Sequence, residues 1–395
     1  MQVATAESSE LATASAVHSA HAALVRALGG APHWLLVQSS VHHDRHDLQR
    51  ALAGLDVPAV HASSSCLGSM TERGAVTDRP GLAMFGVRDP GGGFGVGAAP
   101  LGDDPHAAAG LALQRAIDAA GRPGEMPALV WLTSAPGHEE ACIAGLEALL
   151  GRDVPIVGGS AADDAVAGGW YMLTRDTTLG DGIVVSALFP TGRIISTFQS
   201  GYSPGEPLGV ATRASGRVLH EIDGQPAAAV YNRGSGGAIT HAMQGGNVLA
   251  STTLHPIGRR VGEVGGVPYY RLAHPAAVHP DGSLELFADI SVGDNLVLMH
   301  GDPEALVTRA GRVAADARSL ARVGPDAVAG ALVIFCAGCM LAVRERLDQV
   351  VHGLQQNLGA APFLGCFTFG EQGCFLGGEN RHGNLMISVT LFLPT

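Results

Sequence analysis

One segment near the middle of this chain returns near its end, and this repetition constrains the fold more than any single motif does. The matching spans are residues 129–189 and 332–392, each 61 residues long. Each span begins with an apolar run, passes through a turn and a stretch of helical spacing, and gives a second apolar run after a proline. Both spans end in an alternating strand. A weaker third copy, matched by pattern, covers residues 34–87.

These repeats predict an α/β protein built from repeated β-α-β-β units. Its sheets are expected to be mixed, with parallel and antiparallel strands, as in α+β proteins. Residues 1–30 are predicted to contribute a leading amphipathic helix, which ends at Gly29. Residues 194–199 are predicted to return as a hairpin partner of the strand at 182–189, and the glycines of 91–97 are predicted to form a hairpin turn.

The stretch between the second and last repeats has a different pattern. From 207 to 302, short alternating runs are separated by Gly, Asp and Pro, which predicts an antiparallel β insertion with one short helix near 227–231. Asp302 and Pro303 then indicate the start of a helix that runs to about Ala321.

Composition excludes several classes of protein. Hydrophobic residues make up 46% of the chain and charged residues 15%, as in a well-buried globular protein. The apolar runs are shorter than the ~20 residues of a membrane span, and residues 1–10 lack the basic start of a signal peptide, so we expect a cytoplasmic protein without a membrane partner. The net charge of −12, with no basic run, argues against nucleic acid as a partner. Homo-oligomerisation is left open.

The second strand of each repeat ends in a turn of small residues, at 62–66, 158–162 and 365–371. Small residues at the carboxyl ends of strands let a ligand approach the backbone, and α/β sheets place their sites there. The alternative is that they only allow close packing. The candidate ligand-binding residues of these turns and of the strand ends near them are Gly159, Ser160, Asp163, Cys336 and Gly370.

Several stretches, taken in order, resemble the FIST sensory proteins. They are residues 154–163, 181–189, 335–338, 367–371 and 383–384, and the resemblance extends over residues 31–395. It implies a FIST N-terminal domain at 31–216 with two repeats and a FIST C-terminal domain at 217–395 with the insertion and the third repeat. It further implies a signal-transduction module that binds a small ligand and acts through a partner protein.

Some bacterial FIST proteins that resemble this chain are haem proteins that sense nitric oxide and control a histidine kinase. The resemblance therefore implies, as an alternative, a site for haem b, bound non-covalently because no Cys-x-x-Cys-His sequence occurs. The candidate ligands are His241, His255 and His274. Many relatives have Cys-x-Gly-Arg where this chain has Cys336-Ala-Gly-Cys339, so an arginine that could hold an anionic ligand is missing from that motif.

The cysteines of the last repeat raise two further possibilities. Cys336, Cys339, Cys366 and Cys374 could supply four thiolates to zinc, but they straddle a strand end and lack a zinc-ribbon turn. A thioredoxin-like pair needs its first cysteine at the N-terminus of a helix, which the pattern around Cys336 does not predict. We expect buried, inert thiols.

The motif that resembles FIST also contains an acidic residue after an apolar strand. Glu371 would be costly to bury without a hydrogen-bond donor, and the remaining polar members of the motif are His382 and Asn384. We predict that these three side chains meet, with shared hydrogen bonds, at the mouth of a pocket that Ser160 and Asp163 also line. The alternative is a structural lock of the turn.

Signatures of enzymes are mostly absent from the sequence. The chain has no phosphate loop, and Gly158-Gly-Ser160 lacks the second glycine of a nucleophile elbow. We expect a sensory binding protein rather than an enzyme. The alternative is a hydrolase or transferase that uses Ser160, Asp163 and a histidine.

Overall fold

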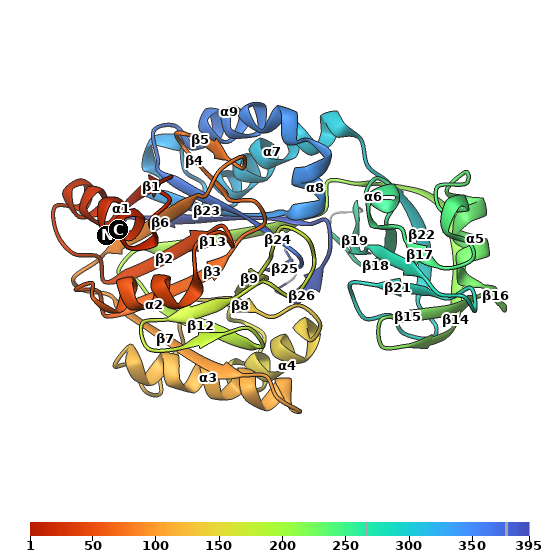
Figure 1. Ribbon diagram of the computed structural model, residues 1–395, viewed down its shortest axis with the longest axis horizontal. Helices are drawn as coiled ribbons and strands as arrows, with labels where there is room; N and C mark the ends of the chain where they lie inside the picture. The colour runs from red at the N-terminus through yellow and green to blue at the C-terminus, as the bar shows by residue number, and fades with distance from the viewer. Residues whose placement is uncertain (265–266, 376–377, 395) are drawn as a thin grey trace.

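The computed structural model describes residues 1–264, 267–375 and 378–394. The chain forms a larger body that contains the repeats and both termini, and a smaller lobe of green strands to the right of it in Figure 1. We call these the repeat body and the insertion lobe. The predicted fold class is confirmed, because helices and mixed sheets alternate along the repeat body.

The first sheet contains the first repeat. Its parallel pair β2 and β3 is joined by α2 (Arg45–Ala53), and β6 runs antiparallel to β2. The strand order is β1-β6-β2-β3-β10-β11. The strands are β1 (Gln2–Ser8), β2 (Trp34–Ser39), β3 (Ala59–Ser64), β6 (Leu82–Arg88), β10 (Met172–Thr174) and β11 (Thr178–Leu179). Strand β1 is not predicted from the sequence, whereas the leading helix is found as α1 (Thr13–Leu28).

The second sheet repeats this arrangement with β8, β9 and β12, in the order β26-β25-β9-β8-β12-β7. Its strands are β7 (Gly93–Pro100), β8 (Leu129–Ser134), β9 (Ile156–Ser160), β12 (Gly182–Phe189), β25 (Glu371–Cys374) and β26 (Asn380–Gly383). The third sheet does so with β23, β24 and β27, in the order β13-β27-β23-β24-β4-β5. Its strands are β4 (Ser69–Thr71), β5 (Gly74–Val76), β13 (Arg193–Gln199), β23 (Gly330–Cys336), β24 (Phe363–Thr368) and β27 (Ile387–Leu393). The predicted common topology of the repeats is confirmed.

Each repeat gives one hairpin to a neighbouring sheet. The hairpin β4–β5 of the first repeat pairs with β24 of the third, β10–β11 of the second pairs with β3 of the first, and β25–β26 of the third pairs with β9 of the second. The three exchanges close a ring, so that every sheet of the repeat body contains strands from two repeats. We refer to this arrangement as the hairpin exchange.

The two predicted hairpins are wrong. Strand β13 follows β12 after a short turn but pairs with β27, and β7 follows β6 but pairs with β12. An alternating pattern predicts a strand and the face that it buries, whereas the backbone groups that select its partner are the same in every strand. Each turn therefore carries the chain to the next sheet.

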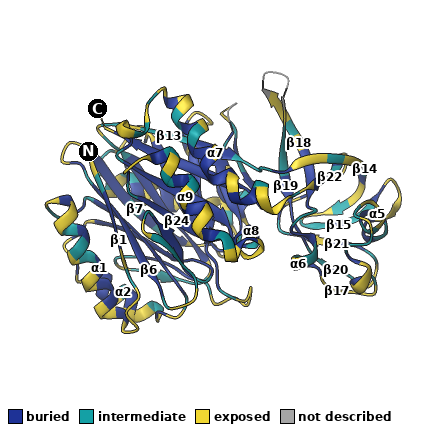
Figure 2. Ribbon diagram, turned by 90° about the horizontal axis from the view of Figure 1, so that it is seen from above, coloured by how far each residue is buried: buried dark blue, intermediate teal, exposed yellow. Residues whose placement is uncertain are grey.

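Helices cover the outer face of each sheet, as the exposed outer and buried inner surfaces in Figure 2 show. Helices α1 and α2 pack on the first sheet, α3 (Pro105–Ala119) and α4 (Glu139–Leu150) on the second, and α7, α8 and α9 on the third. The last three are α7 (Pro303–Ala321), α8 (Ala337–Ala342) and α9 (Leu347–Leu358). The predicted start of α7 is confirmed, because the Asp302 side chain accepts the Glu304 N–H and Pro303 is the first helical residue.

The inner faces of the three sheets meet in one central core. Trp34 of the first sheet, Trp131 of the second and Phe392 of the third all belong to it and are 0–1% exposed. Burial on both faces explains why the strands of the repeats are almost continuously apolar.

The insertion lobe is an antiparallel sheet, as predicted, in the order β17-β20-β21-β15-β14-β22-β18-β19 with β16 beside β15. Its strands are β14 (Ser203–Ser215), β15 (Val218–Ile222), β16 (Gln225–Pro226), β17 (Gly246–Asn247), β18 (Ile257–Val264), β19 (Val267–Ala273), β20 (Pro275–Val278), β21 (Leu284–Leu286) and β22 (Asn295–His300). The lobe also contains α5 (Ala227–Gly234), where the short helix is predicted, and α6 (Leu249–Thr252). Short 3-10 turns lie at Thr240–Ala242, Pro325–Ala327 and Arg344–Arg346. Within the described ranges, no helix combines the length and the apolar character that a membrane crossing requires.

Candidate ligand-binding cavity

The carboxyl ends of β3, β9 and β24 meet at one end of the central core. Backbone hydrogen bonds connect them in a cycle: Cys66 N–H to Phe367 O at 3.0 Å, Ala162 N–H to Ser64 O at 3.2 Å, and Phe369 N–H to Ser160 O at 3.3 Å. The hairpin exchange thus brings the three turns of small residues together.

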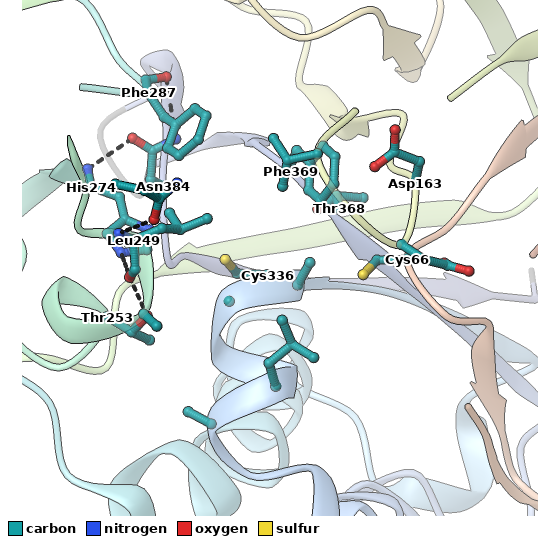
Figure 3. Close-up of a pocket in the computed structure, with 18 of the residues that line it drawn as sticks. Cys66, Asp163, Leu249, Thr253, His274, Phe287, Cys336, Thr368, Phe369 and Asn384 are labelled. Carbon is teal, nitrogen blue, oxygen red and sulfur yellow. Dashed lines mark hydrogen bonds between the residues drawn. The ribbon is translucent and has the colours of Figure 1, made fainter. Parts of the chain in front are cut away.

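A cavity of about 540 Å³ lies between these strand ends and the insertion lobe. In Figure 3, Phe369, Thr368, Asp163 and Cys66 form one side of it, residues of the insertion lobe form the other side, and α8 lies below. The labelled residues from the insertion lobe are Leu249, Thr253, His274 and Phe287. A cavity of this volume, enclosed mainly by apolar groups, is typical of a site for a small molecule.

Three of the eight candidate ligand-binding residues line this cavity, namely Asp163, Cys336 and Asn384. The Asp163 carboxylate accepts the backbone N–H groups of Ala165, Ala167 and Gly169, at distances from 2.7 to 3.3 Å. Asp163 therefore fixes the loop after β9 and presents a carboxylate to the cavity at the same time.

Asn384 and His382 join the insertion lobe to the repeat body. The Asn384 side chain accepts the His274 N–H at 3.1 Å and donates to Phe287 O at 3.3 Å. His382 Nε2 also lies 3.1 Å from Phe287 O, and its Nδ1 lies 3.3 Å from Gln372 Nε2. Gln372 Nε2 can only donate, so the neutral form of the His382 ring accepts at Nδ1 and donates at Nε2. Both side chains hold the wall of the cavity in place.

Glu371 lies behind the cavity and is 0% exposed. It accepts hydrogen bonds from the Thr368 hydroxyl at 3.0 Å and from the Met386 N–H at 2.9 Å, and bonds neither His382 nor Asn384. The predicted shared hydrogen bonds of these three side chains are therefore wrong. Burial raises the pKa of Glu371 well above its usual value, although the Met386 N–H acts in the opposite direction.

Ser160, Gly159 and Gly370 are also behind the cavity wall. The Ser160 hydroxyl donates to Glu139 at 2.6 Å and, among the residues that the structure describes, bonds no histidine. The two glycines allow close packing, because a Cβ atom on Gly370 would lie 2.5 Å from the His382 ring and one on Gly159 would lie 2.4 Å from Thr368. For these two positions the structure favours the packing alternative.

An ion-pair cluster that the sequence does not reveal joins α4 to the insertion lobe. Arg217 donates to Glu139 and Glu140, the latter at 2.9 Å, and lies 3.5 Å from Asp289. Within the described part of the chain, Glu139, Glu140 and His382 are the one group of side chains close enough to hold a metal ion. Arg217 already occupies this group, because it pairs with both carboxylates.

The ion-pair cluster predicts an acid-sensitive contribution to stability. Burial opposes ionisation of Glu140, but His382 and Arg217 lower its pKa from 4.5 to about 2. A carboxyl whose pKa is depressed on folding stabilises the protein above its unfolded pKa and loses this contribution as the pH falls toward the folded pKa. Glu140→Gln should therefore cost up to about 3 kcal/mol at pH 7, by the usual conversion of ~1.4 kcal/mol per pKa unit. The difference from the wild type should shrink between pH 4.5 and pH 2.

Urea unfolding of both proteins at pH 7 and near pH 3 measures this effect. Glu125→Gln is the matched control, because Glu125 is 55% exposed and its pair with Arg122 should contribute little at either pH. A cost of Glu140→Gln that is equal at both pH values would contradict the assignment.

The three candidate metal-binding histidines lie in different places. His274 lines the cavity, whereas His241 is exposed and His255 packs against His300, with their ring centres 5.8 Å apart. Burial lowers the pKa of His274 to about 4, so its ring is neutral near pH 7. Its Nε2 lies 3.0 Å from Leu249 O and must donate to it.

The four cysteines of the last repeat do not form a cluster. Cys366 lies in β24 of the third sheet and Cys374 in β25 of the second, and burial raises the pKa of both thiols. Cys336, however, is the N-cap residue of α8 and Cys339 is the third residue of that helix. The sequence-based argument against a thioredoxin-like arrangement is therefore wrong in its premise, because a helix does begin at Cys336.

The comparisons with known proteins agree with the repeat architecture. A model of the FIST N domain matches residues 33–225, and a model of the FIST C domain matches residues 227–374. The chain belongs to the FIST family. FIST domains are sensory domains, which is consistent with a sensory role for this protein.

Other similarities are more limited. The uncharacterized protein MJ1623 of Methanocaldococcus jannaschii is 31% identical over 81 residues, which are 20% of this chain and 16% of that protein. A cyanuric acid hydrolase from A. caulinodans is 12% identical, with a TM-score of 0.30 over 50% of this chain and 72% of that one. A second cyanuric acid hydrolase, described as an evolutionary innovation by structural concatenation, is 10% identical, with a TM-score of 0.35 over 99% of both chains. Likeness at these scores carries no argument about this chain.

Proposed function

We propose that this protein is a cytoplasmic sensor that binds a small, largely apolar molecule in the cavity and signals through a partner protein, for which a histidine kinase is one candidate. The observation that carries the proposal is the exposed apolar surface of the cavity wall. Leu341 and Val166 line the cavity and are 53% and 44% exposed. Large apolar side chains that face a cavity and water mark a binding surface, because a ligand removes them from water.

The charged residues of the cavity restrict the ligand further. Asp163 and Asp164 line it, and none of the lining residues that the structure describes is arginine or lysine. Cys339 replaces the arginine that many relatives have in the same motif. An anionic ligand would meet these two carboxylates, and no arginine or lysine side chain of the cavity wall would offset them, so the ligand should be neutral or cationic.

Three probes of similar size test this specificity, namely benzylamine, benzyl alcohol and benzoate. Ligand-observed NMR should detect binding of benzylamine and benzyl alcohol but not of benzoate. Leu341→Arg should weaken binding of benzylamine at least tenfold, because it places a cation and a longer side chain at the cavity. Leu320→Arg is the matched control, since Leu320 is 51% exposed on α7 and is not among the lining residues. Equal binding of benzoate, or an equal effect of both substitutions, would count against the proposal.

Haem is the alternative ligand that the family resemblance implies. His274 is the one candidate histidine at the cavity, and its Nε2 already donates to Leu249 O. Histidines that bind a metal commonly donate from Nδ1 to a carbonyl and bind the metal through Nε2. In His274 it is Nε2 that bonds the carbonyl, so the ring has the opposite orientation. The residues at this wall do not fit an axial haem ligand. Protein expressed with ample iron and haem precursor should therefore show no Soret band, and a stoichiometric band would support the haem-based nitric oxide sensor instead.

The hydrolase or transferase alternative finds no support in the contacts of its residues. Ser160 donates to a glutamate, and Asp163 accepts backbone N–H groups of its own loop. A nucleophilic serine would need a base within hydrogen-bond reach.

A further inference from the structure

A cluster of buried ionisable side chains lies directly under the cavity. It consists of Cys336, Cys339, Tyr202 and Arg309, which are all at most 7% exposed. The Cys336 sulfur is at the edge of the cavity in Figure 3, above α8. Cys339 follows on the first turn of the same helix, and its sulfur lies 3.4 Å from the Tyr202 hydroxyl.

Arg309 brings an unbalanced positive charge to this cluster. It comes from α7 and is 1% exposed, with its guanidinium carbon 4.8 Å from the centre of the Phe335 ring. Nη1 donates to Ser200 O and Leu385 O at 2.7 and 2.8 Å, but Nε and Nη2 have no hydrogen-bond partner among the described residues. A buried guanidinium is costly unless a negative group lies nearby.

Cys339 is the group that can supply this negative charge. Burial opposes ionisation of its thiol, but the Cys336 thiol, the charge of Arg309 and the Tyr202 hydroxyl outweigh it and lower the pKa of Cys339 to about 6. The other acid in the neighbourhood is Glu371, whose pKa burial raises. Burial and the hydrogen bond with Cys339 raise the pKa of Cys336 well above its usual value, so Cys336 is the thiol that donates and Cys339 the thiolate that accepts.

We propose that Cys336 and Cys339 are a redox-active dithiol, which a low-molecular-weight disulfide that enters the cavity oxidises to an intramolecular disulfide. Two observations beyond the spacing of the cysteines carry this inference. One is the position of Cys336 on the cavity wall, and the other is the buried Arg309, whose Nε and Nη2 have no hydrogen-bond partner among the described residues. The two thiols share a hydrogen bond, and Cys339 is the third residue of the helix that begins after Cys336, so the two sulfurs are neighbours.

The exchange proceeds in two steps. The Cys339 thiolate takes the proton of Cys336, whose sulfur attacks the disulfide R–S–S–R to form a mixed disulfide and releases R–S⁻. The released thiolate takes the proton from Cys339, and Cys339 then attacks the Cys336 sulfur and expels the second R–S⁻. Two electrons pass from the dithiol to R–S–S–R. The oxidised pair no longer carries the charge that balances Arg309, so oxidation changes the electrostatics directly under the cavity.

Cystamine is the probe, because it is a small cationic disulfide that suits the carboxylates at the cavity; 3,3′-dithiodipropionate is its anionic counterpart of similar size. Reduced full-length protein is incubated with either disulfide at pH 7, unfolded, alkylated and cleaved after arginine. The peptide 323–344 contains Cys336 and Cys339 and no other cysteine. With cystamine this peptide should carry neither alkyl group and should be two hydrogen atoms lighter than its free dithiol form. This product should appear at least tenfold faster than with dithiodipropionate. Cys66 and Cys366 should remain alkylated, because burial raises the pKa of each to about 12.

Variants separate the two thiols. Cys339→Ser lacks both the thiolate that deprotonates Cys336 and the second thiol, so it should react more slowly and should stop at the mixed disulfide on Cys336. Cys336→Ser should block the reaction, and Cys366→Ser, another buried cysteine, should leave the rate unchanged. In Arg309→Met the pKa of Cys339 should rise, so the rate at pH 7 should fall about tenfold and recover at higher pH. Tyr202, Cys336 and Glu371 also face Cys339 and remain in this variant.

The inference would be overturned if peptide 323–344 keeps both alkyl groups in the folded protein, or if all buried cysteines oxidise at one rate. The Cys339→Ser result decides the matter even if Arg309→Met does not fold. The disulfide probes enter the same cavity as the ligand of the proposed function, but the experiment uses none of the benzyl compounds. The redox inference and the proposed function can therefore each fail while the other holds.

Discussion

Fragments 1–200 and 201–395 should each fail to fold alone and should form a stable complex when they are co-expressed. The cut lies after β13 and before β14, in a connection between the repeat body and the insertion lobe. In the first fragment, β9 loses its partner β25, and the strands β4 and β13 lose the sheet that β24 and β27 provide. Open strand edges of this kind promote aggregation.

Solubility, circular dichroism and co-purification of a tag on one fragment measure the outcome. The co-expressed pair is the internal control, because it contains every strand of the intact chain except for one broken peptide bond. A cooperative unfolding transition of fragment 1–200 alone would show that the hairpin exchange is not required for folding of the first two repeats.

The second large effect is expected at the centre of the repeat body. Trp34 is 0% exposed and its ring centre lies 6.3 Å from those of both Phe85 and Phe392. Its indole N–H donates to the Ser186 hydroxyl of the second sheet at 3.0 Å. Trp34→Ala therefore removes contacts to all three sheets and should cost about 3–5 kcal/mol in the free energy of unfolding.

Trp170→Ala is the control for this substitution. Trp170 is only partly buried, packs edge-on against Phe369 and donates to Gly180 O at 3.1 Å. Urea unfolding should show a clearly smaller loss for Trp170→Ala. If the two variants lose equal stability, the central core does not hold the three sheets together in the way that its packing indicates.

The sequence predicts the repeats well because each unit carries a complete signal of its own. Apolar runs of strand length, the helical spacing between them and the prolines before the second runs depend on local structure and burial alone. The helix caps at Asp104 and Asp302 are predictable for the same reason. The pairing of β13 and the hairpin exchange are not predictable in this way, because strand partners are selected by the positions of whole sheets.

The candidate site shows the same limit. Asp163, Cys336, Asn384 and His274 are predicted as candidates and line the cavity, whereas the insertion-lobe residues around them depend on how the lobe docks. Arg309 left a detectable signal that the sequence analysis did not use. It lies on the apolar face of α7 that Leu306, Val313 and Ala317 define, at a position where a charged residue is rarely buried without a partner.

The hairpin exchange also determines when the protein can fold during synthesis. Ser69 of β4 pairs with Cys366 of β24, which the ribosome adds 297 residues later (366 minus 69). At 5–20 residues per second, the hairpin β4–β5 waits roughly 15–60 s for its partner. Strand β9 must likewise wait for β25, so the first and second repeats leave the ribosome with open edges. Sequence-distant pairing of this kind slows folding. It also leaves the unpaired edges of the nascent chain exposed to aggregation until the last strand is released.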